Sequence, residues 1–192
     1  MKYLGRAILC LAAVAMAQNP SPSPQPKQQL STLVQQQFGA TFTPTDKFPT
    51  PVITADFDGD GVEDVAIVAD SKDPLPDSYQ YKYEVADPYN SFFGFGDPRQ
   101  TAGMGHLDPR QNHALLVIFG SGTDAWRAAT PKAKFVLINV PFDSIAAGRM
   151  LIKKNKPPIF VIKAVESQIM DSSVFWDVKK KRWRWEPGNT IN

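Results

Sequence analysis

The sequence predicts a mainly β fold: a single antiparallel sheet or a sandwich, with one short N-terminal helix and a long aromatic loop insertion. An α+β fold is the alternative. Short runs rich in Val, Ile and Phe have the length and composition of strands. These runs are DVAIVAD (64–70), ALLVIFG (114–120), KFVLINV (134–140), PIFVIKAV (158–165) and SSVFWDV (172–178). Most intervals between them are too short for crossover helices, which favours antiparallel pairing.

The first seventeen residues have the form of a secretory signal peptide. Lys2 and Arg6 precede the apolar run AILCLAAVAMA, which closes with small residues at Ala15 and Ala17. The run is too short to span a bilayer, so we expect cleavage after Ala17 and no transmembrane segment afterwards. Cys10 is the chain's only cysteine, and its loss leaves a mature protein without disulfides. The expected location is therefore secreted or periplasmic.

The mature chain divides into a linker and one domain. Residues 18–29 (QNPSPSPQPKQQ) are rich in Pro, Ser and Gln and predict an extended linker. Residues 30–192 have the length of a single β-rich domain. The run LSTLVQQQFG (30–39) has apolar residues near helical spacing and predicts a short helix that stops at Gly39.

The C-terminal sequence SSVFWDVKKKRWRWEP predicts a hairpin. One strand ends near Asp177, VKKK forms the turn, and a second strand begins at Arg182. The two-residue period of a strand places Trp183 and Trp185 on one face, which we expect to be buried. A basic surface for a polyanion, built from Lys179, Lys180, Lys181, Arg182 and Arg184, is the alternative. Removal of Lys2 and Arg6 brings the formal net charge from +2 to zero, which disfavours nucleic acid as the partner.

The stretch TADFDGDGVEDV (54–65) gathers carboxylates with no basic residue among them. Counting Asp56 as position 1, acids fall at positions 1, 3, 5 and 9, which are Asp56, Asp58, Asp60 and Asp64. Gly59 and Gly61 lie between them, where a tight loop needs residues that tolerate positive φ. Alternate positions of such a loop can turn oxygens toward one centre, and Ca²⁺ accepts about 6–8 of them. A solvated acidic turn without metal is the alternative.

This D-x-D-x-D-G-x-x-D spacing, followed by an apolar strand, resembles the calcium loops of FG-GAP repeats, as in integrin α-subunit propellers and related bacterial surface proteins. The resemblance covers Thr54 to Val65 and continues into VAIV. It implies that the calcium ligands are Asp56, Asp58, Asp60, Asp64 and the carbonyl of Val62. The motif occurs once, whereas a propeller needs about 4–8 blades, so the resemblance concerns a site and not the whole fold. An EF-hand would require a carboxylate at position 12, which is Ile67 here.

The segment between residues 71 and 113 is rich in Tyr, Phe, Pro, Asp and Gly. Within it YQYKYEV (79–85) alternates and predicts an added strand, and further along DSIAAGRML (143–151) predicts a helical turn. His106 and His113, the only histidines, match no zinc signature and are interpreted as loop residues. No G-x-S-x-G elbow or phosphate-binding loop occurs.

Three classes of function remain open. We expect an exported, calcium-stabilised binding or structural module without enzymatic activity, which binds a protein or a glycan through the aromatic loop. One alternative is a secreted hydrolase with its site in the 71–113 loop and His106 or His113 as the base. The other is a polyanion binder that uses the basic C-terminal hairpin.

Overall fold

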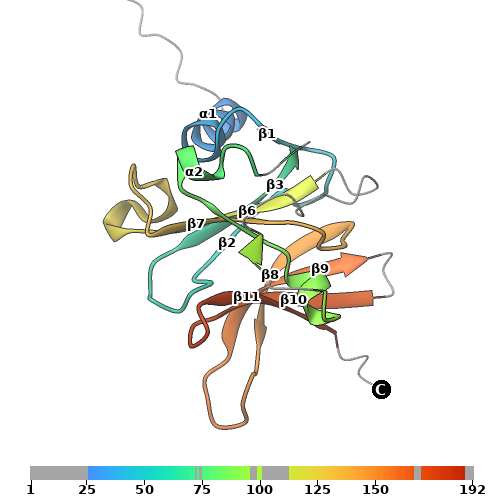
Figure 1. Cartoon of the computed structure of the whole chain (residues 1–192). Helices are drawn as coiled ribbons and strands as arrows, with labels where there is room; N and C mark the ends of the chain where they lie inside the picture. The colour runs from blue at the N-terminus through green and yellow to red at the C-terminus, as the bar shows by residue number, and fades with distance from the viewer. Residues whose placement is uncertain are drawn as a thin grey trace, which may run out of the picture.

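The computed structural model describes residues 26–71, 73, 75–95, 99–100, 113–166 and 170–188 (Figure 1). The expected signal peptide, residues 18–25 of the expected linker, and His106 lie outside the described residues. Among the described helices, none is long and apolar enough to cross a membrane.

The described residues form eleven strands in two sheets. Sheet A contains β1 (Phe42–Pro44), β2 (Val52–Ala55), β3 (Asp64–Ser71), β4 (Glu84–Ala86), β5 (Arg99–Gln100), β6 (His113–Phe119) and β7 (Ala133–Leu137). Its order is β1-β3-β6-β7-β4-β5, and β2 pairs with β3 beside β1. All of its pairs are antiparallel except β4 with β7. The prediction of a mainly β fold is confirmed.

Sheet B is a meander of four antiparallel strands in the order β11-β10-β9-β8. Its strands are β8 (Ser144–Met150), β9 (Ile159–Glu166), β10 (Met170–Asp177) and β11 (Arg182–Pro187). Trp183 and Trp185 of β11 are only 1% and 5% exposed, while Lys179 to Lys181 are exposed at the turn. The predicted hairpin, with its boundaries at Asp177 and Arg182, is confirmed.

Sheet A lies between two other layers (Figure 1). Helix α1 (Pro26–Phe38) covers one face, where Val34 and Phe38 join a buried cluster with Ile67 and Leu116. Sheet B covers the other face. Because both faces of β3 and β6 are covered, these strands are buried along nearly their whole length, which explains their continuous apolar sequences.

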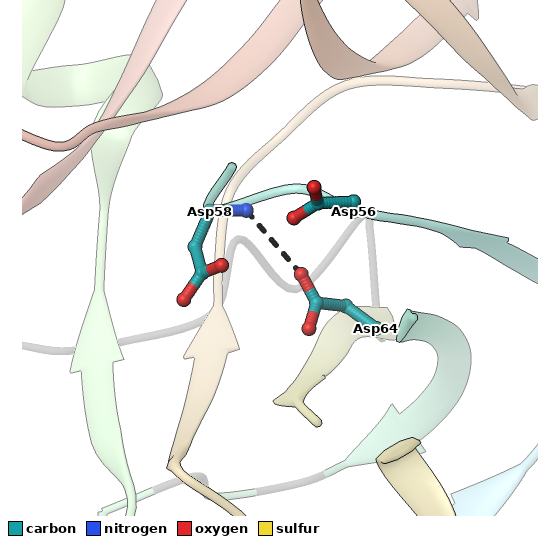
Figure 2. Close-up of side chains that lie close together, drawn as sticks. All are labelled: Asp56, Asp58 and Asp64. Carbon is teal, nitrogen blue, oxygen red and sulfur yellow. Dashed lines mark hydrogen bonds between the residues drawn. The ribbon is translucent and has the colours of Figure 1, made fainter. Parts of the chain in front are cut away.

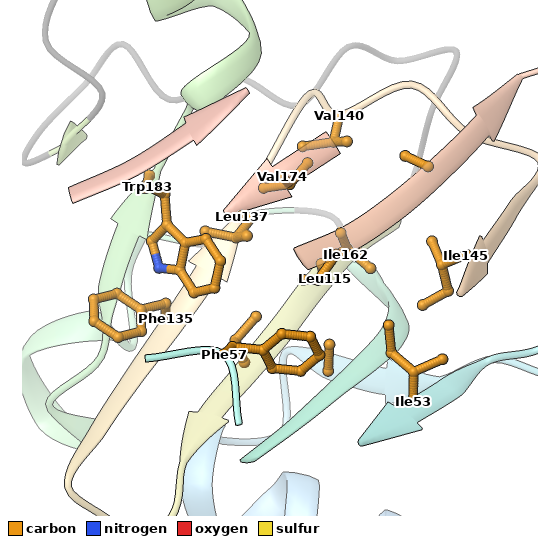
Figure 3. Close-up of a cluster of buried hydrophobic side chains, with 14 of the residues drawn as sticks. Ile53, Phe57, Leu115, Phe135, Leu137, Val140, Ile145, Ile162, Val174 and Trp183 are labelled. Atoms are coloured by element: carbon orange, nitrogen blue, oxygen red, sulfur yellow. The ribbon is translucent and has the colours of Figure 1, made fainter. Parts of the chain in front are cut away.

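The larger core fills the space between the two sheets (Figure 3). Leu115, Phe135 and Leu137 contribute from sheet A, and Ile162 and Trp183 contribute from sheet B. Burial of these large side chains from both sheets supplies the main stabilisation of the interface between them.

The N-terminal helix is longer than predicted. It begins at Pro26, four residues before the expected start at Leu30, and so includes the end of the predicted linker. Proline is tolerated in the first turn of a helix because its missing N–H has no partner there. The helix ends at Phe38, and Gly39 has a φ of +94°, as its predicted role as a stop requires.

Two predictions of local structure were wrong. Residues 144–150 form strand β8 instead of a helical turn, because they pair along their length with β9. Residues 78–81 form helix α2 (Ser78–Tyr81), which ends at Lys82 with a φ of +55°, so only β4 of the predicted strand over 79–85 exists. At β8 tertiary pairing with β9 outweighs local sequence preference. Two further short helices are α3 (Pro88–Phe92) and the 3₁₀ helix η1 (Gly122–Arg127).

Candidate functional site

The acidic loop connects β2 to β3. These strands are antiparallel neighbours, and Ala55 pairs with Asp64, so the chain reverses direction within residues 56–63. Gly59 and Gly61 have φ values of +77° and +89°, which lie in the left-handed region that glycine adopts without strain. The predicted need for two glycines in this loop is met.

Three of the predicted carboxylates come together. One oxygen from each of Asp56, Asp58 and Asp64 lies within 4.8 Å of the others (Figure 2). Asp58 and Asp64 are buried, and Asp56 is half-buried at the edge of the group. Like charges at this separation repel one another, so the arrangement requires compensation from hydrogen-bond donors or from a cation.

Asp64 is the most buried of the three and is held by backbone donors. Its Oδ2 accepts a hydrogen bond from the N–H of Phe57 at 2.7 Å. The same oxygen accepts a hydrogen bond from the N–H of Asp58 at 3.3 Å (Figure 2). Its Oδ1 accepts a hydrogen bond from Gly120 N–H at 2.8 Å. Burial nevertheless raises the pKa of Asp64 to about 7. The nearby charge of Asp58 acts in the same direction.

The other aspartates close the loop through similar contacts. Asp56 accepts hydrogen bonds from the N–H of Gly59 at 2.8 Å, Asp60 at 3.0 Å and Gly61 at 2.9 Å. Asp60 in turn accepts a hydrogen bond from Val62 N–H at 2.8 Å. These are the local side-chain to backbone bonds that aspartate typically forms in turns. The carboxylates therefore shape the loop themselves.

Lys132, which sequence reasoning missed, lies against the acidic loop. Its Nζ donates hydrogen bonds to Asp58 Oδ2 and Asp60 Oδ2, each at 2.6 Å. The backbone N–H of Lys132 bonds to the carbonyl of Phe119 at 3.0 Å, which fixes its position at the end of β6. Hydrogen bonds to the two carboxylates raise the pKa of Lys132, and the lysine lowers the pKa of Asp60.

Lys132 changes the assignment of the predicted ligands. Asp60 faces the lysine and does not belong to the group of three carboxylates. Asp58 is a member of the group of three carboxylates and also contacts Lys132 through Oδ2. Its Oδ1 accepts a hydrogen bond from Asp60 N–H at 3.2 Å. Hard carboxylate oxygens suit Ca²⁺, so the donor set fits this ion, although the lysine competes for one of its members.

The connection between β6 and β7 packs over the loop. Trp126 of η1 donates its indole N–H to Glu63 Oε1 at 2.9 Å. Gly120 approaches so closely that an added Cβ would lie 2.8 Å from Val62 Cγ1 and 2.9 Å from the carbonyl carbon of Ala125. The loop is therefore held between its own strands and the 120–132 segment.

The candidate catalytic base His113 has a largely aromatic environment. It is the first residue of β6, and its ring centroid lies 5.0 Å from that of Phe48 and 4.5 Å from that of Phe142. Burial lowers its pKa. This packing favours a structural role for the side chain.

The basic hairpin is partly neutralised. Arg184 lies 3.0 Å from Glu186 and 3.6 Å from Asp177, whereas Lys179 to Lys181 point into solvent at the turn.

Comparison of the chain with family models, curated proteins and solved structures found no match.

Proposed function

We propose that this protein is an exported, non-enzymatic binding module whose Asp56–Asp64 loop binds one Ca²⁺ in the manner of an FG-GAP calcium loop. The observation that carries the proposal is the approach of Asp56, Asp58 and Asp64 oxygens to within 4.8 Å of one another. The export part of the proposal rests on the signal-like sequence of residues 1–17.

The state of the carboxylates supports cation binding. Two of the three are buried, and Ca²⁺ would replace mutual repulsion by attraction at this position. An ionised carboxylate has about four lone-pair sites, so the existing backbone hydrogen bonds leave acceptor capacity. The loop is also shaped by these bonds in advance, which reduces the conformational entropy lost on binding.

Lys132 gives the proposed site a second state. Without metal, the ammonium group pairs with both Asp58 and Asp60 and offsets one of their two negative charges. When Ca²⁺ binds, it competes with Lys132 for Asp58, so this exchange lowers the net gain from the metal. A calcium affinity in the range of extracellular modules, with a Kd of about 10⁻⁴ to 10⁻³ M, is therefore expected.

Thermal unfolding in EDTA and in millimolar CaCl₂ tests the proposal. At a hundredfold excess over Kd, calcium should stabilise the fold by about 2.7 kcal/mol, and Tm should rise by about 2–4 °C for each kcal/mol. Asp56→Asn should remove the shift. Asp70→Asn, which changes an exposed carboxylate paired with Lys47, should retain it. Equal Tm values for the native protein in EDTA and in calcium would refute calcium binding.

Terbium luminescence supplies a second readout. Tb³⁺ substitutes for Ca²⁺, and a nearby indole sensitises its emission. Trp126 is the suitable donor, since it bonds to Glu63 within the loop. We expect emission that Ca²⁺ displaces and that Trp126→Phe reduces, whereas Trp183→Phe, in the core between the sheets, should reduce it less.

A further inference from the structure

A pocket of about 200 Å³ lies between α3 and β11. Its lining includes Pro88, Ser91 and Phe92 of α3 and Arg182, Arg184 and Trp185 of β11. Strand β11 is the outer strand of sheet B, with β10 as its partner, and α3 packs against it. The pocket therefore lies at an edge of the sheet, away from the acidic loop, none of whose residues line it.

Arg182 is the unusual member of this lining. Its Nε is buried and has no hydrogen-bond partner, and within the described part of the chain its guanidinium forms no ion pair. The neighbouring Arg184 is paired with Glu186 and Asp177. A buried donor without a partner costs about 1–3 kcal/mol, and more when it is charged. An acceptor from a ligand would remove that cost.

The aromatic residues of the pocket lining differ in exposure, because Trp183 and Trp185 are buried and Phe92 is exposed. The ring centroid of Trp185 lies 5.1 Å from that of Tyr89 and 4.9 Å from that of Phe92. Its buried indole N–H has no hydrogen-bond partner among the residues that the structure describes. Phe92 and Phe93 are 47% and 53% exposed. Exposed aromatic rings beside unpaired donors are typical of sites that combine ring stacking with polar recognition.

We propose that this pocket binds a carboxylated sugar, with a hexuronic acid residue as its occupant. The planar carboxylate would pair with the Arg182 guanidinium, and the apolar face of the sugar ring would lie on the exposed ring of Phe92, which packs against Trp185. The hexuronic acid would be the ligand of the binding module proposed above. The inference rests on the non-enzymatic binding role in that proposal and does not depend on calcium.

The charges at the pocket favour a single carboxylate over a polyphosphate. Among the described residues Arg182 has no ion-pair partner, whereas Arg184 is paired with Asp177 and Glu186. Glu186 and Asp177 would repel a second negative charge on the ligand. The volume also suits one sugar ring better than a chain of nucleotides.

Indole N–H signals in a ¹H–¹⁵N NMR titration of the full chain with sodium glucuronate test the inference. The Trp185 signal should shift with a saturable Kd, and the Trp126 signal should not move. Arg182→Gln should weaken binding at least tenfold, and Arg182→Lys should weaken it less. Arg149→Gln is the matched control and should bind normally, because it changes a guanidinium on β8 that lies 4.8 Å from the ring centroid of Phe160 on β9. Preserved dispersion of the remaining indole signals shows that each variant is folded.

Glucose, inorganic phosphate and a single-stranded oligonucleotide serve as competing probes. Glucose bound as tightly as glucuronate would overturn the role of the carboxylate, and equal affinity for phosphate would indicate a general anion site. Oligonucleotide binding lost on substitution of Lys179 to Lys181 would instead establish the polyanion reading. Absence of glucuronate binding with an intact calcium-dependent Tm shift refutes this inference alone, whereas glucuronate binding without that shift refutes only the calcium proposal.

Discussion

Lys132 Nζ lies 2.6 Å from Oδ2 of Asp58, whose side chain is only 4% exposed, although the two residues are 74 positions apart. The acidic loop therefore has a counterion from the opposite side of β6, in addition to its backbone donors. Whether the loop needs a metal ion depends on how much of its charge this lysine already balances.

Lys132→Met should separate the stabilisation of the acidic loop by Lys132 from its stabilisation by calcium. In EDTA the variant should lose about 1–2 kcal/mol of unfolding free energy, because Asp58 and Asp60 lose their partner while solvent screens part of the loss. In calcium the stabilisation should exceed that of the native protein, since the metal no longer competes with the ammonium group. Urea unfolding in both buffers measures this. Lys47→Met, which removes the exposed pair with Asp70, is the control and should change stability by less than about 1 kcal/mol. A native-like calcium response would show that Lys132 and calcium do not compete.

Gly120→Ala should destabilise the protein by about 1–3 kcal/mol, the usual range for overpacking. The added Cβ would contact the carbonyl of Glu63 and would lie 2.8 Å from Val62 Cγ1, so the 120–132 segment would move off the loop. Thermal unfolding in EDTA tests this effect. Ser121→Ala, whose hydroxyl caps no N–H of η1, should stay within about 0.5 kcal/mol of the native protein. Equal stability of the two variants would mean that the close approach at Gly120 is unimportant.

His113→Phe should reduce the loss of stability in mild acid. Burial lowers the pKa of His113 below its ordinary 6.5, although Asp70 and Asp143 act to raise it and Lys47 to lower it. The unfolded chain therefore binds a proton more readily than the folded one, and stability falls as the pH drops through 6.5 toward the folded pKa. Urea unfolding at pH 7.5 and 5.5 should give a smaller difference for the variant, because Phe preserves packing with Phe48 and Phe142. An unchanged difference would mean that His113 does not titrate on unfolding.

Trp183→Ala should cost about 3–5 kcal/mol, the range for removing a buried aromatic side chain. Its ring centroid lies 5.8 Å from that of Phe119 and 5.7 Å from that of Phe135, within the core between the sheets. Trp126→Ala, at the partly exposed η1, is the comparison and should cost less. Chemical denaturation of both variants measures the two losses of unfolding free energy. A larger loss for Trp126→Ala than for Trp183→Ala would show that the core between the sheets is not the main source of stability.

The strands that could be predicted from sequence are those whose residues are buried on one or both faces. The runs at β3 and β6 are continuous because α1 and sheet B cover the two faces, and the tryptophans of β11 alternate because one face packs inward. Strand β8 has small and polar residues at an outer position of sheet B, so its sequence does not distinguish a strand from a helical turn.

The candidate site could be predicted only in part. Spacing within the loop indicated Asp56, Asp58 and Asp64, because all three lie within nine residues of one another. Lys132 could not be found this way, since its approach depends on how β6 and β7 pair in sheet A. The orientation of Asp60 toward that lysine follows from the same long-range contact.

The succession of the two sheets along the chain has a consequence for biosynthesis. Residues 26–143 emerge from the ribosome before β8 to β11. One face of sheet A, which includes Leu115, Phe135 and Leu137, therefore stays exposed to solvent until sheet B has been synthesised. Sheet B then forms through connections between neighbouring strands, which are local contacts and fold quickly. A chain that terminates near residue 143 would keep this apolar face exposed and would aggregate, whereas the complete chain covers it with its own last four strands.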